Sequence, residues 1–164
     1  MVDVVSEWDD FGVVIGGAAG ALVDLLFVAI SIRAPSISNS VPLRNRAAHT
    51  LVVFGSLLLG AVLLVTPGQP QWLLGTEFVV LSVVMIAALV TFDRRLEPIG
   101  RRGRVDWATR VVSPDTVTAA LTGGAGVVTM FGSGWGLFLL VPSACVAIVG
   151  GLAGAWSLLT NVVD

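Results

Sequence analysis

Long apolar runs, separated by short polar segments, set the pattern of this chain. A helix needs about 20 mostly apolar residues to cross the hydrocarbon core of a bilayer, so runs of this length predict transmembrane helices. The sequence therefore predicts an all-α fold, a polytopic membrane helix bundle with residues 1–164 as its single domain. We expect five spans, at about residues 11–32, 49–66, 73–92, 115–131 and 135–162.

The apolar segment 114–164 is too long for one span. As a continuous helix it would measure about 76 Å, against a hydrocarbon core of ~30 Å. The glycine-containing stretch 131–136 divides it, and Ser113 and Pro114 are residue types favoured at a helix N-cap and at the first helical position. An alternative is that residues 115–131 form a re-entrant or broken helix around their glycines.

Composition agrees with a membrane protein. Hydrophobic residues make up 55% of the chain and charged residues only 12%, whereas about a quarter of the residues of a soluble domain are charged. The N-terminal segment is acidic and has no basic residue, so we expect a retained span and not a cleaved signal peptide.

The positive charges indicate an orientation. All nine basic residues are arginines, and they fall between the first two expected spans or in the arginine-rich loop 93–114. Because cytoplasmic loops carry an excess of arginine and lysine, we expect the N-terminus outside and the C-terminus inside a bacterial cytoplasmic (inner) membrane. Four spans instead of five would place the C-terminus outside.

One acid lies deep in the first span. Gly12, Gly16, Gly20 and Asp24 follow one another at i+4 spacing, so we expect them to form one stripe along the helix. Small residues let helices pack closely, as we also expect at Gly151 in the last span. Asp24 lies about 20 Å into the bilayer, where a carboxyl group needs the bundle interior, water or a polar partner. It is interpreted either as a proton or cation site or as a protonated group that locks a helix contact.

Other chemical candidates are weaker. Glu77, near the start of the third span, is either a helix-start acid that reaches the interface or a contributor to an ion path with Asp24. His49 begins the second span as an interfacial residue or a proton relay. One histidine and one cysteine give no metal cluster, and no phosphate-binding or dinucleotide-binding pattern is present, so we expect no metal, no cofactor and no enzymatic activity.

Arginines in the loop 93–114 have two interpretations. They serve topology alone, or they bind anionic lipid head groups. The residues concerned are Arg94, Arg95, Arg101, Arg102 and Arg104. Nucleic acid is not an expected partner of so short a loop beside a membrane.

Three segments, LVDLLFVAISIRA, LRNRAAHTLVVF and GLFLLVPSACVAIVGGLAGAWSLL, resemble a family of small actinobacterial multi-pass integral membrane proteins. The resemblance implies a multi-pass fold and supplies no catalytic residues. From the residues themselves, the first hypothesis is an oligomeric channel or transporter that passes protons or small cations past Asp24. The second is a regulatory or scaffolding subunit that binds another membrane protein through its glycine-rich helix faces.

Overall fold

The computed structural model describes residues 8–94 and 113–160, and the regular elements within them are all helices. In chain order they are α1 (Asp9–Ile32), α2 (Ala34–Asn39), α3 (Val41–Val65), α4 (Gln71–Arg94), α6 (Pro114–Met130), the 3₁₀ helix η2 (Gly134–Leu139) and α7 (Leu140–Thr160). This confirms the expected all-α class.

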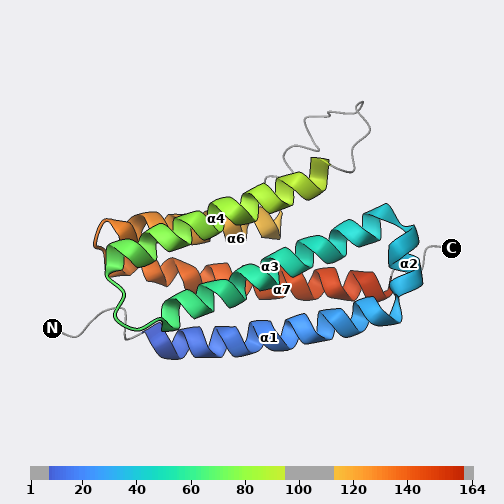
Figure 1. The fold of residues 1–164 in the computed structure, drawn as a ribbon, viewed down its shortest axis with the longest axis horizontal. Coiled ribbons are helices and arrows are strands. Elements are labelled where there is room, and N and C mark those ends of the chain that lie inside the picture. The colour runs from blue at the N-terminus through green and yellow to red at the C-terminus, as the bar shows by residue number, and fades with distance from the viewer. Residues whose placement is uncertain (1–7, 95–112, 161–164) are drawn as a thin grey trace.

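The long helices lie side by side and alternate in direction (Figure 1). α3 contacts α1, α4 and α7, while α6 packs against α4 and α7. Arg33, Arg44 and Arg46 lie near the ends of α1 and α3 that α2 connects, and we call this the arginine end of the bundle. The opposite end carries the start of α1 and the connections at residues 66–70 and 131–133.

Four helical segments are long and apolar enough to cross a membrane: Asp9–Ile32, Leu43–Val65, Gln71–Phe92 and Gly134–Ser157. The expectation of five is corrected to four within the described residues. The remaining long helix, α6, has 17 residues, which at 1.5 Å per residue make it about 25 Å long. It ends at Met130, and Gly132 then takes a φ of 81°, a turn conformation that favours glycine.

The second span begins earlier than the sequence indicated. Residues 34–48 were expected to be a polar loop, but α2 and the first turns of α3 occupy them, and α3 starts at Val41 instead of at residue 49. Pro42 sits at the start of α3, where a missing N–H costs nothing. Arg44 and Arg46 are exposed, because their long side chains can extend toward water from the helix end.

The short helix α6 begins as its sequence indicates. Ser113 is its N-cap, and the Ser113 side chain accepts a hydrogen bond from the backbone N–H of Thr116 at 3.3 Å. α6 then lies against α4 with very little space between the two backbones. A Cβ atom on Gly126 would lie 2.7 Å from the carbonyl oxygen of Gly75. The buried Ser82 hydroxyl of α4 donates to the Ala119 carbonyl of α6 at 2.7 Å, so polar and close-packing contacts hold this pair together.

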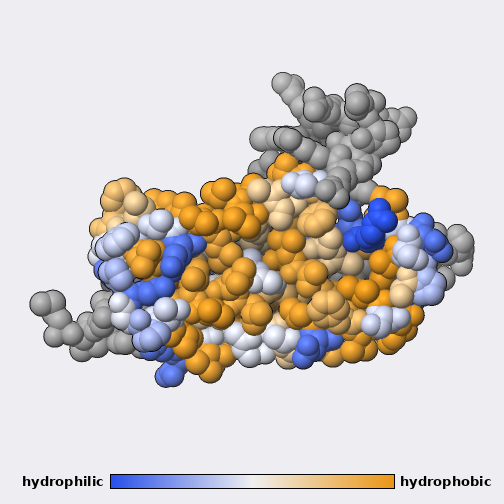
Figure 2. All heavy atoms as spheres, viewed as in Figure 1, coloured by the Kyte–Doolittle hydropathy of each residue, from blue (hydrophilic) through white to orange (hydrophobic). Residues whose placement is uncertain are grey.

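The outer surface matches a membrane-facing bundle. Apolar residues cover the middle of the face shown in Figure 2, and polar residues gather toward the two ends. Large apolar side chains stay exposed on α1, α3, α4 and α7, which is the arrangement that a surrounding hydrocarbon phase tolerates.

Candidate functional site

The first half of the glycine series on α1 packs against α3. Gly12 is buried, and a Cβ atom there would lie 2.7 Å from Val65 Cγ2 and 3.1 Å from Leu64 Cβ. A Cβ atom on Gly16 would lie 3.2 Å from that of Ala61. These two glycines therefore occupy a close helix contact of the kind expected from the sequence.

The second half of the series turns away from the bundle. A Cβ atom on Gly20 would meet nothing within 4 Å, and Asp24 is exposed. The reason is helical geometry, since each i+4 step advances about 40° beyond a full turn. Three such steps carry Asp24 about 120° around the axis from Gly12. The four residues were expected to form one stripe, but they wind from the packed side of α1 to its outer side.

Asp24 lies on an outward face of α1, which we call the outer face. Its other members are the exposed residues Val13, Gly17, Ala21 and Val28. A Cβ atom on Gly17 would meet nothing within 4 Å. Among the described residues, none forms a hydrogen bond or ion pair with Asp24, and Asp24 lines neither the hydroxyl-lined cavity of the bundle nor the cavity at its arginine end. The carboxyl group thus faces the surroundings of the bundle.

Glu77 lies apart from Asp24, near the opposite end of the bundle. It is half-buried in the second turn of α4, and its Oε2 accepts a hydrogen bond from Gln69 Nε2 at 3.0 Å. Gln69 belongs to the connection between α3 and α4. This contact ties that connection to α4, and no contact among the described residues joins Glu77 and Asp24 into one path.

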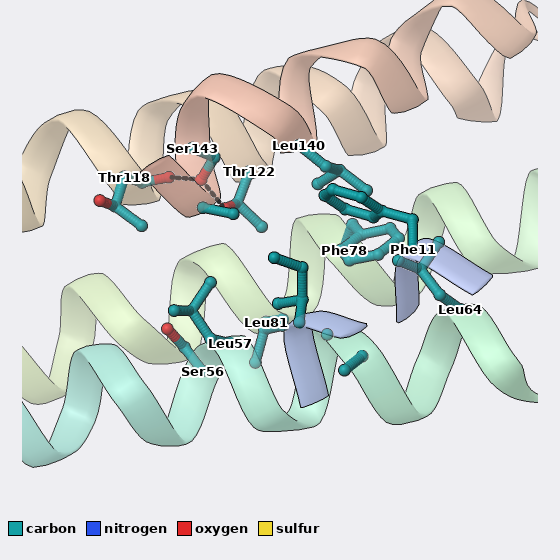
Figure 3. A pocket seen from close by; sticks show the side chains of 14 residues that line it. Phe11, Ser56, Leu57, Leu64, Phe78, Leu81, Thr118, Thr122, Leu140 and Ser143 are labelled. Atoms are coloured by element: carbon teal, nitrogen blue, oxygen red, sulfur yellow. Dashed lines mark hydrogen bonds between the residues drawn. The ribbon is translucent and has the colours of Figure 1, made fainter. Parts of the chain in front are cut away.

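The bundle contains a small, partly open cavity of about 30 Å³ that is lined partly by hydroxyl groups. Figure 3 shows Thr122 and Ser143 pointing toward each other beside it, with their oxygens 2.9 Å apart. Ser143 Oγ also donates to the Thr118 carbonyl oxygen at 3.1 Å. The space would hold a water molecule. Its lining contains no ionisable side chain, so this interior site offers hydroxyl contacts between α6 and α7 and no acid.

A polar cavity of about 510 Å³ opens at the arginine end between α3, α6 and α7. His49 Nδ1 and Asp115 Oδ2 lie 3.1 Å apart in it, although 66 residues separate them in the chain. Arg46 Nη1 donates to Ser157 Oγ at 3.3 Å across the cavity wall. The sequence placed His49 at this end but did not reveal Asp115 or Arg46 as its neighbours. A signal was present, because a helix start at Ser113 and Pro114, expected on the same side as the arginines, places Asp115 at that end.

The other expected site residues divide into two groups. Gly151 is buried where α7 meets α3, and a Cβ atom there would collide with the Phe54 ring. Arg95, Arg101, Arg102 and Arg104 lie outside the described residues, as does the side chain of Arg94, so the expected head-group contacts stay predictions. Within residues 8–94 and 113–160, no group of three or more histidine, cysteine or acidic side chains could hold a metal ion.

Comparison with protein families, with curated proteins and with solved structures finds no match to this chain. The resemblance to small actinobacterial membrane proteins therefore stays a prediction. The features of the molecule that bear on function are the exposed Asp24 and the polar groups at the arginine end.

Proposed function

We propose that the protein is an integral membrane protein of a bacterial cytoplasmic membrane, with its arginine end in the cytoplasm. Four helices of sufficient length and apolarity support the membrane assignment. Arg33, Arg44 and Arg46 at one end support the orientation, because positive charge is retained on the cytoplasmic side. The start of α1 then faces outward. The helix α6 runs back from the arginine end before α7 begins, so the end of α7 faces inward even with four candidate spans.

Within that membrane, the protein acts as a non-enzymatic subunit that associates with another membrane helix through the outer face of α1. The observation that carries this function is the exposed Asp24 carboxyl, sixteenth of the 24 residues of α1. A carboxyl group exposed to hydrocarbon costs several kcal/mol, on the order of 3 kcal/mol by insertion scales. A neighbouring helix that supplies a hydrogen bond removes much of this cost.

The shape of the outer face supports the same function. Gly17 and Ala21 are exposed at i+4 spacing one to two turns before Asp24, and the space beside Gly17 is open. Small residues at this spacing let two helix backbones approach closely in a membrane. Close approach brings the Asp24 carboxyl within reach of polar groups on the second helix, which is either another copy of this chain or a different membrane protein.

Passage of protons or small cations is the second candidate function. Asp24 favours it, as an ionisable residue well inside a candidate span. The interior cavity is small and has no acid in its lining, so a path within one bundle has little support. A path between associated copies, with Asp24 of each copy facing it, is the form of this function that the geometry favours.

Energy transfer between labelled copies in liposomes tests the association. With donor and acceptor dyes on separate copies, Asp24→Leu should lower the transfer clearly, while Asp24→Asn, which keeps a hydrogen-bonding group, should retain more of it. Glu77→Gln is the matched control, because it also removes an acid but lies away from the outer face. Transfer that is unchanged in Asp24→Leu would rule out the role of this residue in self-association.

Two further measurements separate the remaining possibilities. Recovery of a distinct membrane protein with the parent chain, and its loss with Asp24→Leu, would show that the helix bound by the outer face belongs to a different protein. Proton or cation flux into liposomes tests the second candidate. If the parent conducts nothing, or if Asp24→Asn conducts as well as the parent, passage through this residue is excluded.

A further inference from the structure

The polar cavity at the arginine end has features of a binding site that the proposed association does not use. It lies between α3, α6 and α7, and none of its lining residues belongs to α1. We call it the α3–α6–α7 cavity. Its volume of about 510 Å³ falls within the range of ~300–1,000 Å³ typical of small-ligand sites.

The cavity lies at the depth where spans meet the membrane surface. Its α3 residues fall between Asn45 and Thr50, close to the start of the candidate span at Leu43. Its α7 residues lie between Gly150 and Ser157, where the last candidate span ends. In the proposed orientation this is the head-group level of the cytoplasmic leaflet.

The lining carries one permanent cation and one acid, and the cation bonds Ser157 while the acid contacts His49. Arg46 on α3 is the permanent cation, and a guanidinium group has five N–H donors, of which one bonds Ser157. Asp115 on α6 is the acid, and His49 of α3 lies 3.1 Å from its carboxyl oxygen. α7 contributes no charged side chain to the lining. The N-terminal end of α6, which begins at Pro114 in the cavity wall, adds the positive end of a helix dipole.

Small residues form most of the wall that α7 contributes to the cavity. Gly150, Gly151 and Gly154 line it together with Ala153. A Cβ atom on Gly154 would lie 2.9 Å from Thr50 Oγ1, and one on Gly150 would lie 2.6 Å from Pro114 Cβ. These distances show that α7 packs closely against α3 and α6 at the glycines, so larger side chains there would displace the helices that form the cavity.

We propose that the α3–α6–α7 cavity binds the phosphate group of an anionic phospholipid, with Arg46 as the charged contact. Basic pockets between transmembrane helices on the cytoplasmic side take anionic head groups, and a guanidinium group bonds phosphate oxygens through two parallel N–H donors. The hydroxyls of Thr50 and Ser157, which also line the cavity, donate to carbonyl groups of their own helices, so the N–H donors for the phosphate come from Arg46. A soluble phosphate has the same chemistry, but the depth of the cavity favours a lipid.

Lipid titration of the detergent-solubilised full chain, followed by native mass spectrometry, tests this proposal. Phosphatidylglycerol should bind the parent more tightly than phosphatidylcholine does, and Arg46→Gln should weaken phosphatidylglycerol binding about tenfold, the loss of one charge-assisted contact. Arg44→Gln is the matched control. It removes the same charge two residues away, from an exposed position that does not line the cavity, and should change binding less than twofold.

A second variant distinguishes lipid binding in the cavity from a general effect of positive charge on lipid binding. Ala153→Leu keeps every charge but places a larger side chain in the cavity, and it should also weaken phosphatidylglycerol binding. Equal losses in Arg46→Gln and Arg44→Gln, or unchanged binding in Ala153→Leu, would overturn the site. Inorganic phosphate in excess should not displace the lipid. If phosphate alone binds the parent and the lipid does not, a soluble ligand replaces the lipid and the proposal fails.

Discussion

Gly12 and Asp24 belong to the same helix but face in different directions, with Gly12 packed against α3 and Asp24 exposed on the outer side of α1. One side of α1 therefore builds the bundle, and the other presents small residues and a carboxyl group to the surroundings. This division explains how a helix can contribute to folding and still be available for association.

Packing at the start of α1 should be sensitive to size. Gly12→Ala places a methyl group 2.7 Å from Val65 Cγ2, and overpacking of this kind costs about 1–3 kcal/mol. Gly20→Ala meets nothing within 4 Å and should be neutral or stabilising, because alanine favours helix. Equilibrium unfolding in mixed micelles measures both variants, and equal stabilities would contradict the packing described for α1.

The contact between α4 and α6 should be more sensitive to an added methyl group than the contact between α1 and α3. A Cβ atom on Gly75 would meet backbone atoms of Gly126 and Met130, and backbone atoms cannot move aside as a side chain can. Gly75→Ala should therefore destabilise the protein more than Gly12→Ala does. Gly55→Ala, with open space around it, serves as the control in the same unfolding assay. A Gly75→Ala variant as stable as that control would refute the close contact.

A buried hydroxyl should stabilise the same helix pair. Ser82 donates to the Ala119 carbonyl at 2.7 Å and is 5% exposed. Ser82→Ala should lower the free energy of unfolding by about 0.5–1.5 kcal/mol. Thr91→Val is the comparison, since the Thr91 hydroxyl bonds only the Ala87 carbonyl of its own helix. The two variants would lose equal stability only if the bond between helices contributed nothing.

His49 and Asp115 should be weakly coupled. Their side chains are 23% and 25% exposed, so solvent screens the pair and a coupling energy of about 0.2–1 kcal/mol is expected. A double-mutant cycle with His49→Gln and Asp115→Asn measures it from unfolding free energies. A coupling energy of zero would mean that the 3.1 Å contact does not hold α3 and α6 together.

The apolar runs predicted most of the bundle, because span length and hydropathy are local properties of the chain. The first and third spans agree with α1 and α4 to within about two residues. The start of α3 was placed too late, since arginines at a helix end were interpreted as a loop. The helix expected at residues 115–131 lies at Pro114–Met130 and has the expected 17 residues, but it is not among the four helices long enough to span a membrane.

The side-chain neighbours could not be predicted in the same way. An i+4 series looks like a straight stripe in the sequence, and only the accumulated rotation separates Asp24 from Gly12. The approach of His49 to Asp115 depends on how α6 lies against α3 and α7, which hydropathy does not encode. The α3–α6–α7 cavity, with Arg46 in its wall, is likewise a product of the packing of three helices.

Cysteine cross-linking in lipid vesicles tests association through the outer face of α1 most directly. With Cys145 replaced by serine, Ala21→Cys places a thiol on the outer face, and Val83→Cys places one on an exposed side of α4. We expect disulfide-linked dimers from Ala21→Cys, far fewer from Val83→Cys, and a loss of the former when Asp24→Leu is added. Equal cross-linking at the two positions, or dimers at Ala21 that persist without Asp24, would contradict association between copies of this protein through the outer face of α1.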